Sequence, residues 1–373
     1  FSDLFEIGNG RDYKHLSSGD IPVYGSGGYM LSVNDYLYDG ESVCIGRKGT
    51  IDKPIFLSGK FWTVDTLFYT HSFNGCTPKF IHYVFQNINW QNHNEAGGVP
   101  SLSKTNVYKI EVCVPQPKEQ QKIASCLSSL DEVITSHNQK LELLKLHKKG
   151  FMQNLFPQEG ETVPKWRFKE FEKDGKWEYS KIENYIDLFS GIALKSEDIS
   201  DDESGIPILR GINITEGYIR HSKEIDKYFL DDIEKFDKYL VKENDIVIAM
   251  DGSKVGKNVA LINKEDENSI LIQRVARIRT NKKSDIRYIY QHFLSEKFRN
   301  YVDTVNTSSG IPHISSQQIK DFKMGFSSLS EQQKIASCLS SLEELITAQN
   351  VKIEQLKQHK KGLMQGLFPK INE

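Results

Sequence analysis

The stretch that decides the fold is residues 119–157, which read EQQKIASCLSSLDEVITSHNQKLELLKLHKKGFMQNLFP. It returns 212 residues later, at residues 331–369, as EQQKIASCLSSLEELITAQNVKIEQLKQHKKGLMQGLFP, with 29 of the 39 positions identical. Self-similarity of this kind points to one structural unit that is used twice. Because the segments before the two copies differ, we expect two different heads on one repeated frame.

Each copy has the pattern of a long helix with an apolar seam. Apolar residues recur at steps of three and four, which is typical of a coiled coil, with His137 and Gln349 in the one polar slot of each seam. A helix of this length would span roughly 55 Å at 1.5 Å per residue. A seam needs a matching partner, which favours pairing of the copies over the alternative of one amphipathic helix on its own domain. The predicted seam residues are Ile123, Leu127, Leu130, Ile134, Leu141, Leu144, Ile335, Leu339, Leu342, Ile346, Ile353 and Leu356.

The ends of these helices also have sequence signals. Pro157 and Pro369 close the two copies, and Pro115 and Pro117 stand before the first one. Ser330 with Gln333 is predicted to form a capping box at the start of the second helix.

Short strand-like runs and turn residues fill the segments outside the repeat. In the first head we predict a helix over residues 78–87 and a short one after Ser103 as its N-cap. The predicted fold class is α+β, with two mixed α/β heads separated by two long helices that form a coiled coil. The predicted domains are residues 1–116 and 158–328 for the heads, with 117–157 and 329–373 for the spacer helices.

The two heads follow the same order of elements. Residues 21–25 correspond to 206–211, residues 42–46 to 245–249, and residues 98–102 to 310–314. The second head has residues 177–184 ahead of a segment that matches residues 1–5. We therefore expect that some native residues precede Phe1.

Composition narrows the class of protein. Hydrophobic residues make up 38% and charged residues 26%, as in ordinary globular proteins, and no apolar run of about 18 residues is present. The five cysteines lack metal-site spacing, which predicts reduced thiols and a cytoplasmic location. The net charge of −2 excludes a uniformly basic DNA-binding surface, although a local basic face remains compatible with it.

Catalytic motifs are missing from the sequence. It contains no GxxxxGK[ST] phosphate loop, no GxGxxG, no HExxH and no Asn/Asp-Pro-Pro-aromatic motif of an amino-methyltransferase. The acidic turn of Asp198, Asp201, Asp202 and Glu203 is interpreted as solvated surface. No catalytic site and no metal site is therefore predicted from the motifs.

Polar and basic loops are the candidate binding residues. Residues 46–50 form a compact basic loop after a strand, and residues 251–257 are again basic and hydroxyl-bearing. Arginine and asparagine can hold guanine and adenine through two hydrogen bonds, and lysines contact phosphate. The candidate DNA-binding residues are Tyr24, Ser26, Tyr29, Arg47, Lys48, Asn92, Asn94, Arg210, Asn213, Ser253, Lys254, Lys257, Ser308 and Ser309.

The sequence resembles the specificity subunits of type I restriction-modification systems. The resemblance rests on the duplicated EQQKIAS and HKKGxMQxLFP, each copy following a head with Ile-Pro near its start and Gly-Val/Ile-Pro near its end. It implies two target-recognition domains that bind a bipartite, asymmetric double-stranded DNA target. It also implies that the repeated helices form an antiparallel coiled coil, with a pseudo-twofold internal repeat, and dock two modification methyltransferase subunits. It also implies a non-enzymatic chain in a complex with adenine-specific DNA methyltransferase and ATP-dependent endonuclease activity.

The resemblance further implies that the cofactors act outside this chain. S-adenosylmethionine, ATP and magnesium are expected in partner subunits, including the restriction motor-nuclease subunits of the full complex. Two rivals remain open at this point: a coiled-coil scaffold with two protein- or glycan-binding heads, and the specificity tail of a fused methyltransferase-nuclease.

Overall fold

A computed structural model describes residues 1–158, 160–230, 234–306 and 312–369. The chain divides into two compact units, one of residues 1–141 with 349–373 and the other of residues 142–348. Each unit contains one globular head together with a part of each long helix, and each is described here by itself.

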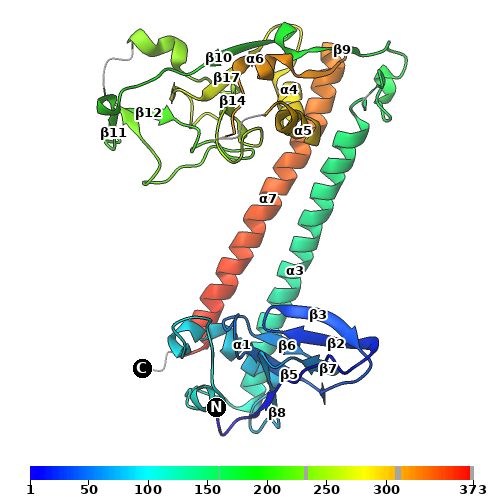
Figure 1. Ribbon diagram of the computed structural model, residues 1–373, viewed down its shortest axis with the longest axis vertical. Helices are drawn as coiled ribbons and strands as arrows, with labels where there is room; N and C mark the ends of the chain where they lie inside the picture. The colour runs from blue at the N-terminus through cyan, green and yellow to red at the C-terminus, as the bar shows by residue number, and fades with distance from the viewer. Residues whose placement is uncertain (159, 231–233, 307–311, 370–373) are drawn as a thin grey trace. The chain divides into compact units, whose positions relative to one another are not determined.

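Two four-stranded sheets build the head of unit 1 (Figure 1). The first sheet has the order β1-β8-β5-β6 with all neighbours antiparallel, and the central β5 is buried along its whole length. The second has the order β3-β2-β7-β4, in which β2 and β7 are parallel. The strands are β1 (Glu6–Asn9), β2 (Ser18–Gly25), β3 (Gly28–Val33), β4 (Tyr38–Asp39), β5 (Ser42–Gly46), β6 (Ile55–Leu57), β7 (Lys60–Thr63) and β8 (Leu67–His71).

The two helices predicted for this head are confirmed. Helix α1 (Pro78–Asn87) begins after Thr77, whose side chain accepts a hydrogen bond from the backbone of Phe80. Helix α2 (Lys104–Tyr108) has Ser103 as its N-cap, as predicted. A short 3-10 turn, η1 (Trp90–His93), lies between them along the chain. The cap at Ser103 could be predicted from the sequence because a cap depends only on neighbouring residues.

The head of unit 2 repeats the same sheet plan. Its first sheet has the order β10-β17-β14-β15 and is antiparallel throughout, and its second has the order β11-β13-β12-β16 with one parallel pair, β12 and β16. A ribbon of β9 and β18 completes it. The strands are β9 (Glu178–Lys181), β10 (Ile186–Ser190), β11 (Ile199–Ser200), β12 (Ile206–Leu209), β13 (Tyr228–Phe229), β14 (Ile246–Ala249), β15 (Val259–Leu261), β16 (Ile270–Leu271), β17 (Val275–Thr280) and β18 (Lys323–Phe326).

Three α-helices cover unit 2's head, and each begins at a side-chain cap. Asp285 caps α4 (Ile286–Phe293), Ser295 caps α5 (Glu296–Val305), and Ser315 with Gln318 forms a capping box on α6 (Ser316–Asp321). Helix α5 occupies the place along the chain where unit 1 has only η1. The remaining 3-10 turns are η2 (Lys169–Phe171), η3 (Ile182–Asn184), η4 (Ser196–Asp198) and η5 (Glu234–Tyr239).

The repeat forms two long helices, α3 (Pro117–Asn154) and α7 (Leu329–Leu367). The predicted capping box at Ser330 is wrong: α7 begins at Leu329, and the backbone of Glu331 donates to the hydroxyl of Ser328 at 3.4 Å. The chain offers three serines in this stretch, and the strand that ends at Phe326 leaves Ser328 as the residue at the boundary.

The two helices run antiparallel where they meet. Within unit 1, Asp131 of α3 contacts Lys360 of α7, whereas His137 further along α3 contacts Gln349, which lies earlier in α7. The predicted seam residues lie on the covered sides of the helices, because Ile123, Leu127 and Leu141 are buried and Leu130 and Ile134 are half-buried. The α+β fold with an antiparallel pair of repeated helices is therefore confirmed.

Each head takes part of its core from both copies of the repeat. In unit 1 the first turns of α3 supply Ile123 and Leu127, and Met364 at the end of α7 and Phe368 directly after it complete the set. In unit 2 the roles are exchanged, since α7 supplies Ile335 and Leu339 and the segment at the end of α3 supplies Leu155 and Phe156. Burial of each such side chain contributes roughly 1.5–3 kcal/mol. Equivalent positions of the two copies therefore pack in equivalent places of the two heads.

Candidate nucleic-acid interface

Three loops of unit 1 converge around Gly49. After the buried strand β5 the chain emerges at Arg47 and Lys48, which are exposed. The backbone of Gly49, which has φ of +91°, donates to the carbonyl of Pro100 at 2.8 Å. A side chain on Gly49 would come within 3.3 Å of the hydroxyl of Ser26. The loops at residues 25–29, 46–50 and 94–102 therefore form one surface.

The aromatic candidates of that surface lie on the β2–β3 hairpin. Tyr29 is 63% exposed, and its ring meets the ring of the half-buried Tyr24 edge to face with centroids 6.1 Å apart. Ser26 is half-buried in the turn between the strands. The ring of Tyr29 is therefore accessible to a ligand, whereas the ring of Tyr24 packs against it.

Positive charge gathers next to these loops. The guanidinium of Arg47 lies 5.9 Å from the ring centroid of Phe68, and the ammonium of Lys104 lies 6.0 Å from the same centroid. Burial lowers the pKa of Lys104, and the nearby charge of Arg47 lowers it further. The ammonium of Lys104 already donates to the carbonyl of Ile7 at 2.6 Å, so the exposed Arg47 is the freer of the two cations for contact with an anion.

The two asparagine candidates of unit 1 differ in how far their side chains are already engaged in hydrogen bonds within the protein. Asn92 is exposed on η1 and accepts a hydrogen bond from the side chain of Asn89. Asn94 uses its side chain inside its own loop, donating to the carbonyl of Ala96 and accepting from the backbones of Ala96 and Ser101. Asn94 therefore braces the loop that holds Gly49.

Unit 2 anchors its corresponding loop in the same way. The backbone of Gly252 donates to the carbonyl of Pro312 at 3.0 Å, and the backbone of Ile314 donates to the carbonyl of Met250 at 2.8 Å. Ser253, Lys254 and Lys257 are exposed on this loop. The anchoring repeats the bonds of Gly49 to Pro100 and of Leu102 to Arg47 in unit 1.

The side chains on the two anchored loops are different. Asp251 stands where unit 1 has Lys48, and its carboxylate accepts from Arg274 at 2.7 Å. Met250 stands where unit 1 has Arg47. One backbone scaffold thus presents a lysine in one head and an aspartate in the other at the same position.

Arg210 and Asn213 lie in the loop after β12. Asn213 is 1% exposed, accepts from the backbone of Arg210 and donates to Asp226 and to the carbonyl of Arg220. Arg210 is half-buried and donates to the carbonyl of Ile225. The side chain of Asn213 therefore holds the loop together. The candidates Ser308 and Ser309 fall outside the described residues.

A histidine fastens this loop to the turn before β16. The imidazole of His221 lies 2.7 Å from the buried carboxylate of Asp266 and 3.2 Å from that of Asp226. Partial burial lowers the pKa of His221, but its hydrogen bond and attraction to Asp266, with Asp226, outweigh burial and raise the pKa overall. The contact of His221 with Asp266 therefore holds the loop that carries Arg210 and Asn213 against the turn before β16, and we call it the His221 clip.

Sequence reasoning missed the glutamines that attach each head to its helix. Gln120 is fully buried, accepts from the backbone of Thr77 and donates to the carbonyls of Gly75 and Pro115. Gln332, at the same repeat position, accepts from the backbone of Asp285 and donates to the carbonyl of Ser327. Identity of this glutamine in both copies was the available signal, and only the tertiary contacts explain it.

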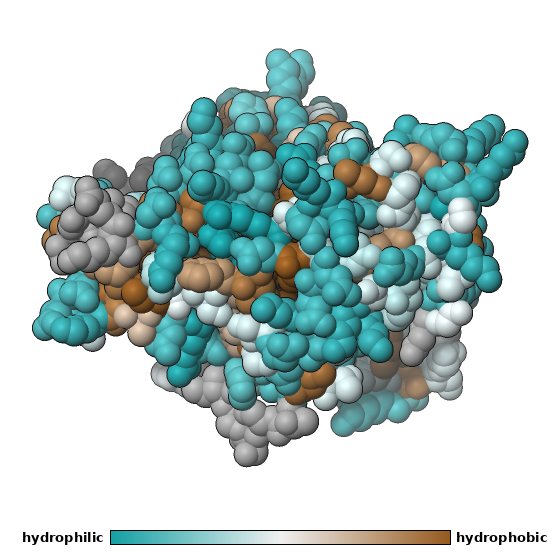
Figure 2. Space-filling model, turned by 90° about the horizontal axis from the view of Figure 1, so that it is seen from above, coloured by the Kyte–Doolittle hydropathy of each residue, from teal (hydrophilic) through white to brown (hydrophobic). Residues whose placement is uncertain are grey.

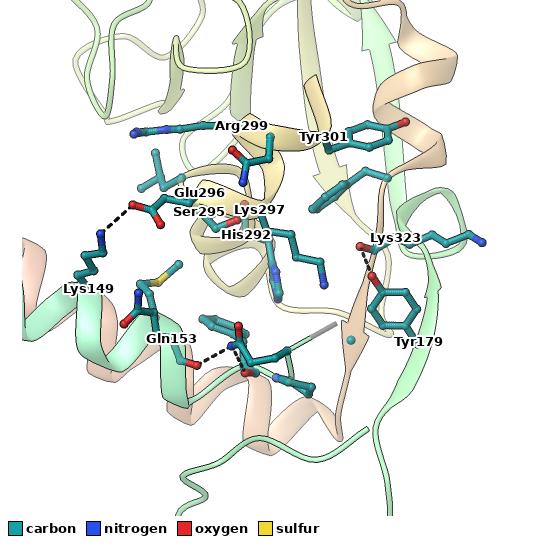
Figure 3. Close-up of a pocket in the computed structure, with 18 of the residues that line it drawn as sticks. Lys149, Gln153, Tyr179, His292, Ser295, Glu296, Lys297, Arg299, Tyr301 and Lys323 are labelled. Carbon is teal, nitrogen blue, oxygen red and sulfur yellow. Dashed lines mark hydrogen bonds and ion pairs between the residues drawn. The ribbon is translucent and has the colours of Figure 1, made fainter. Parts of the chain in front are cut away.

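A groove of about 1170 Å³ lies within unit 2, between the end of α3, helix α5 and the β9–β18 ribbon (Figure 3). His292 reaches into it, and burial together with the charge of Lys297 lowers the pKa of His292 to about 3, so the imidazole is neutral at pH 7. Seven cationic side chains line the groove. Five of them have a carboxylate within ion-pair distance, such as Lys149 with Glu296 and Lys181 with Asp321, so little uncompensated charge remains.

The surface seen in Figure 2 is mostly hydrophilic, with hydrophobic residues in small separate patches. A surface of this kind suits polar and charged contacts better than a wide apolar interface. Among the described residues no cluster of three or more histidine, cysteine or acidic side chains could hold a metal ion. No helix in the described part of the chain is long and apolar enough to cross a membrane.

Comparisons with known proteins agree with this arrangement. Residues 1–146 and 174–358 match the family model described as the type I restriction modification DNA specificity domain. The MjaVIII specificity subunit of a type I restriction enzyme from Methanocaldococcus jannaschii is 26% identical over 352 residues, which cover 91% of this chain and 79% of that protein. The EcoAI specificity subunit from Escherichia coli is 28% identical over 241 residues, 64% of this chain and 38% of that protein.

Solved structures show the same fold. The crystal structure of a type I restriction-modification S subunit from M. genitalium superposes with a TM-score of 0.68 at 13% identity, covering all of this chain and 95% of the other. A structure from work on the assembly and conformational transition of the type I restriction-modification system gives a TM-score of 0.57 at 12% identity, covering 98% and 95%.

Proposed function

The chain belongs to the family of type I restriction-modification specificity subunits, and from that premise we propose that its two heads read the two halves of a split, asymmetric DNA target. The observation that carries the proposal is the pair of loops after β5 and β14. They are anchored by equivalent backbone hydrogen bonds but carry Arg47 and Lys48 in one head and Met250 and Asp251 in the other. A shared scaffold with different side chains suits two different half-sites.

In this proposal the repeated helices act as the spacer of the target. Antiparallel helices related by a local twofold would present the two heads to opposite DNA strands, as the subunits of a symmetric dimer do on a palindrome. Parallel helices would bring the heads together and remove the spacing function. The unread gap between the half-sites would then follow helix length, so insertion of a few residues into both helices should lengthen it.

The repeated helices would also dock two modification methyltransferase subunits, one on each copy. Near-identity of the copies supports this, because two copies of one partner need two equivalent surfaces. S-adenosylmethionine would then act in those subunits, and ATP and magnesium in the restriction motor-nuclease subunits of the full complex. This chain would supply sequence choice and leave the chemistry to its partners.

The most informative experiment is coexpression of the chain with its neighbouring methyltransferase, followed by mapping of methylated bases across a genome. A split asymmetric motif is the expected result. Formation of the complex without any new methylation would overturn the proposal. Binding of the purified chain to duplex DNA at several salt concentrations adds a second readout, because phosphate contacts release counterions and give a negative slope of affinity against salt. A scaffold for proteins or glycans would show no such slope.

A further inference from the structure

One acidic residue at the same position of each repeat copy connects a head to both long helices. Asp131 lies in α3, and Glu343 lies 212 residues later in α7. Each carboxylate uses one oxygen for its head and the other for a lysine of the opposite repeat copy. We call these two groups the acid clusters of unit 1 and unit 2.

In unit 1 the acid cluster consists of Asp131, Tyr83 and Lys360. The phenol of Tyr83, from α1, donates to one carboxylate oxygen of Asp131 at 2.9 Å. The ammonium of Lys360, from α7, donates to the other oxygen at 2.6 Å and lies 5.2 Å from the centroid of the Tyr83 ring. Burial raises the pKa of Tyr83, and the charge of Asp131 raises it further, so the phenol keeps its proton and remains a donor.

In unit 2 the acid cluster consists of Glu343, Gln291 and Lys148. The side-chain amide of Gln291, from α4, donates to one carboxylate oxygen of Glu343 at 3.2 Å, and Lys148 of α3 donates to the other at 2.5 Å. Gln291 stands six residues after its helix cap Asp285, as Tyr83 does after Thr77. The two clusters therefore use equivalent positions of head, near helix and far helix, with different head residues.

The clusters set the register of the helix pair in a way that the apolar seam alone does not. A shift of one helix by seven residues would still bring apolar seam residues together, because the seam repeats at that interval. The same shift would separate each carboxylate from its lysine, because Lys360 and Lys148 lie on the helix of the opposite copy, whereas Tyr83 and Gln291 would stay with the carboxylate of their own head's helix.

We propose that Asp131 and Glu343 are positioning residues that fix the register of the two helices and the orientation of each head on them. They would thereby set the allowed gap between the two DNA half-sites. This inference rests on the proposed function. A salt bridge with partly exposed partners adds little to global stability. The side chain of Asp131 is 37% exposed and that of Glu343 is 28% exposed. We therefore expect these ion pairs to restrict the geometry of the helix pair more than they stabilise the fold.

The test compares two double variants of the full chain. Asp131→Ala with Glu343→Ala removes both carboxylates, whereas the control, Asp131→Glu with Glu343→Asp, gives each position the acid that the other copy uses. Affinity is measured on duplexes that carry both mapped half-sites with the native gap and with one base pair added or removed. A second readout is the distribution of single-molecule energy-transfer distances between dyes at exposed Glu41 and Glu203.

For the alanine variant we expect the preference for the native gap to fall by about tenfold, which corresponds to roughly 1.4 kcal/mol. Its distance distribution should broaden, while the exchanged-acid control keeps the unmodified behaviour in both measurements. A folded alanine variant with an unchanged gap preference and an unchanged distance distribution would overturn the inference. If the unmodified chain shows no gap preference on any duplex, the proposed function itself fails, and the distance measurement still reports on the clusters.

Discussion

Gln349 lies 2.8 Å from the imidazole Nδ1 of His137 and donates to the carbonyl oxygen of His137 at 2.7 Å, although the two residues occupy the same position of the repeat. Two antiparallel copies meet at equal positions only at the midpoint of their overlap. The one polar layer of the seam therefore marks that midpoint, and it is also a place where the copies differ.

Replacing both members of this pair by leucine should raise the free energy of unfolding, because a well-packed apolar pair avoids the desolvation of two polar groups. Gln349→Leu alone should instead destabilise the chain by roughly 1–3 kcal/mol, since the His137 imidazole would lose its partner. Chemical denaturation of both variants measures the difference. A single variant as stable as the double one would contradict the role of the pair.

Gln120→Ala should destabilise unit 1 by about 2–4 kcal/mol, because the buried amide makes three hydrogen bonds to the backbone of the head. Gln332→Ala should have a similar effect on unit 2. The matched controls are Gln121→Ala and Gln333→Ala, since these exposed neighbours lie one residue further along each helix. Chemical denaturation followed by a probe in each head should show the loss of stability for Gln120→Ala and Gln332→Ala only.

Glu331→Ala should be more harmful than Glu119→Ala, although the two glutamates share a repeat position. Glu331 is fully buried and accepts two hydrogen bonds from Arg167, both at 2.8 Å, whereas Glu119 is exposed. Removal of one partner from a buried ion pair costs roughly 3–5 kcal/mol, but an exposed substitution stays within about 0.5 kcal/mol. Equal melting temperatures for the two variants would refute this account.

The His221 clip predicts a pH effect on the loop that carries Arg210. Because the pKa of His221 is raised in the folded chain, its stabilising contribution is fully present below the ordinary value of 6.5 and is lost as pH rises through the higher folded value. Protease sensitivity or hydrogen exchange of residues 210–226 should therefore increase over that window. His221→Gln should remove the pH dependence, and a persistent dependence would assign it to another group.

Lys48→Ala should weaken binding to DNA by a similar factor on the mapped target and on unrelated sequence, if the exposed ammonium contacts a phosphate. The slope of log affinity against log salt should fall by about 0.9 for one lost phosphate contact. Arg210→Ala should instead cost roughly 1–3 kcal/mol on the cognate half-site if it contacts a base. Equal loss on both sequences would assign Arg210 to phosphate.

Local signals carried the correct predictions. The repeat, the apolar seam and the cap at Ser103 depend on residues that are close in the chain, so the pattern alone placed α1, α2, α3 and α7. The cap of α7 was misplaced at Ser330, because three nearby serines satisfy the local rule and the preceding strand decides among them. The loop candidates remain predictions, and the structure adds that Asn94 and Asn213 already hold their own loops.

By itself, the sequence determined that one frame is used twice, that its helices pair through an apolar seam, and that the heads differ. Only the tertiary structure decided what holds each head to both helices: the buried glutamines Gln120 and Gln332 and the carboxylates of Asp131 and Glu343. The reason is physical. The spacing of neighbouring residues determines a seam, whereas the hydrogen bond between Lys360 and Asp131 joins groups 229 residues apart that only the folded backbone brings together.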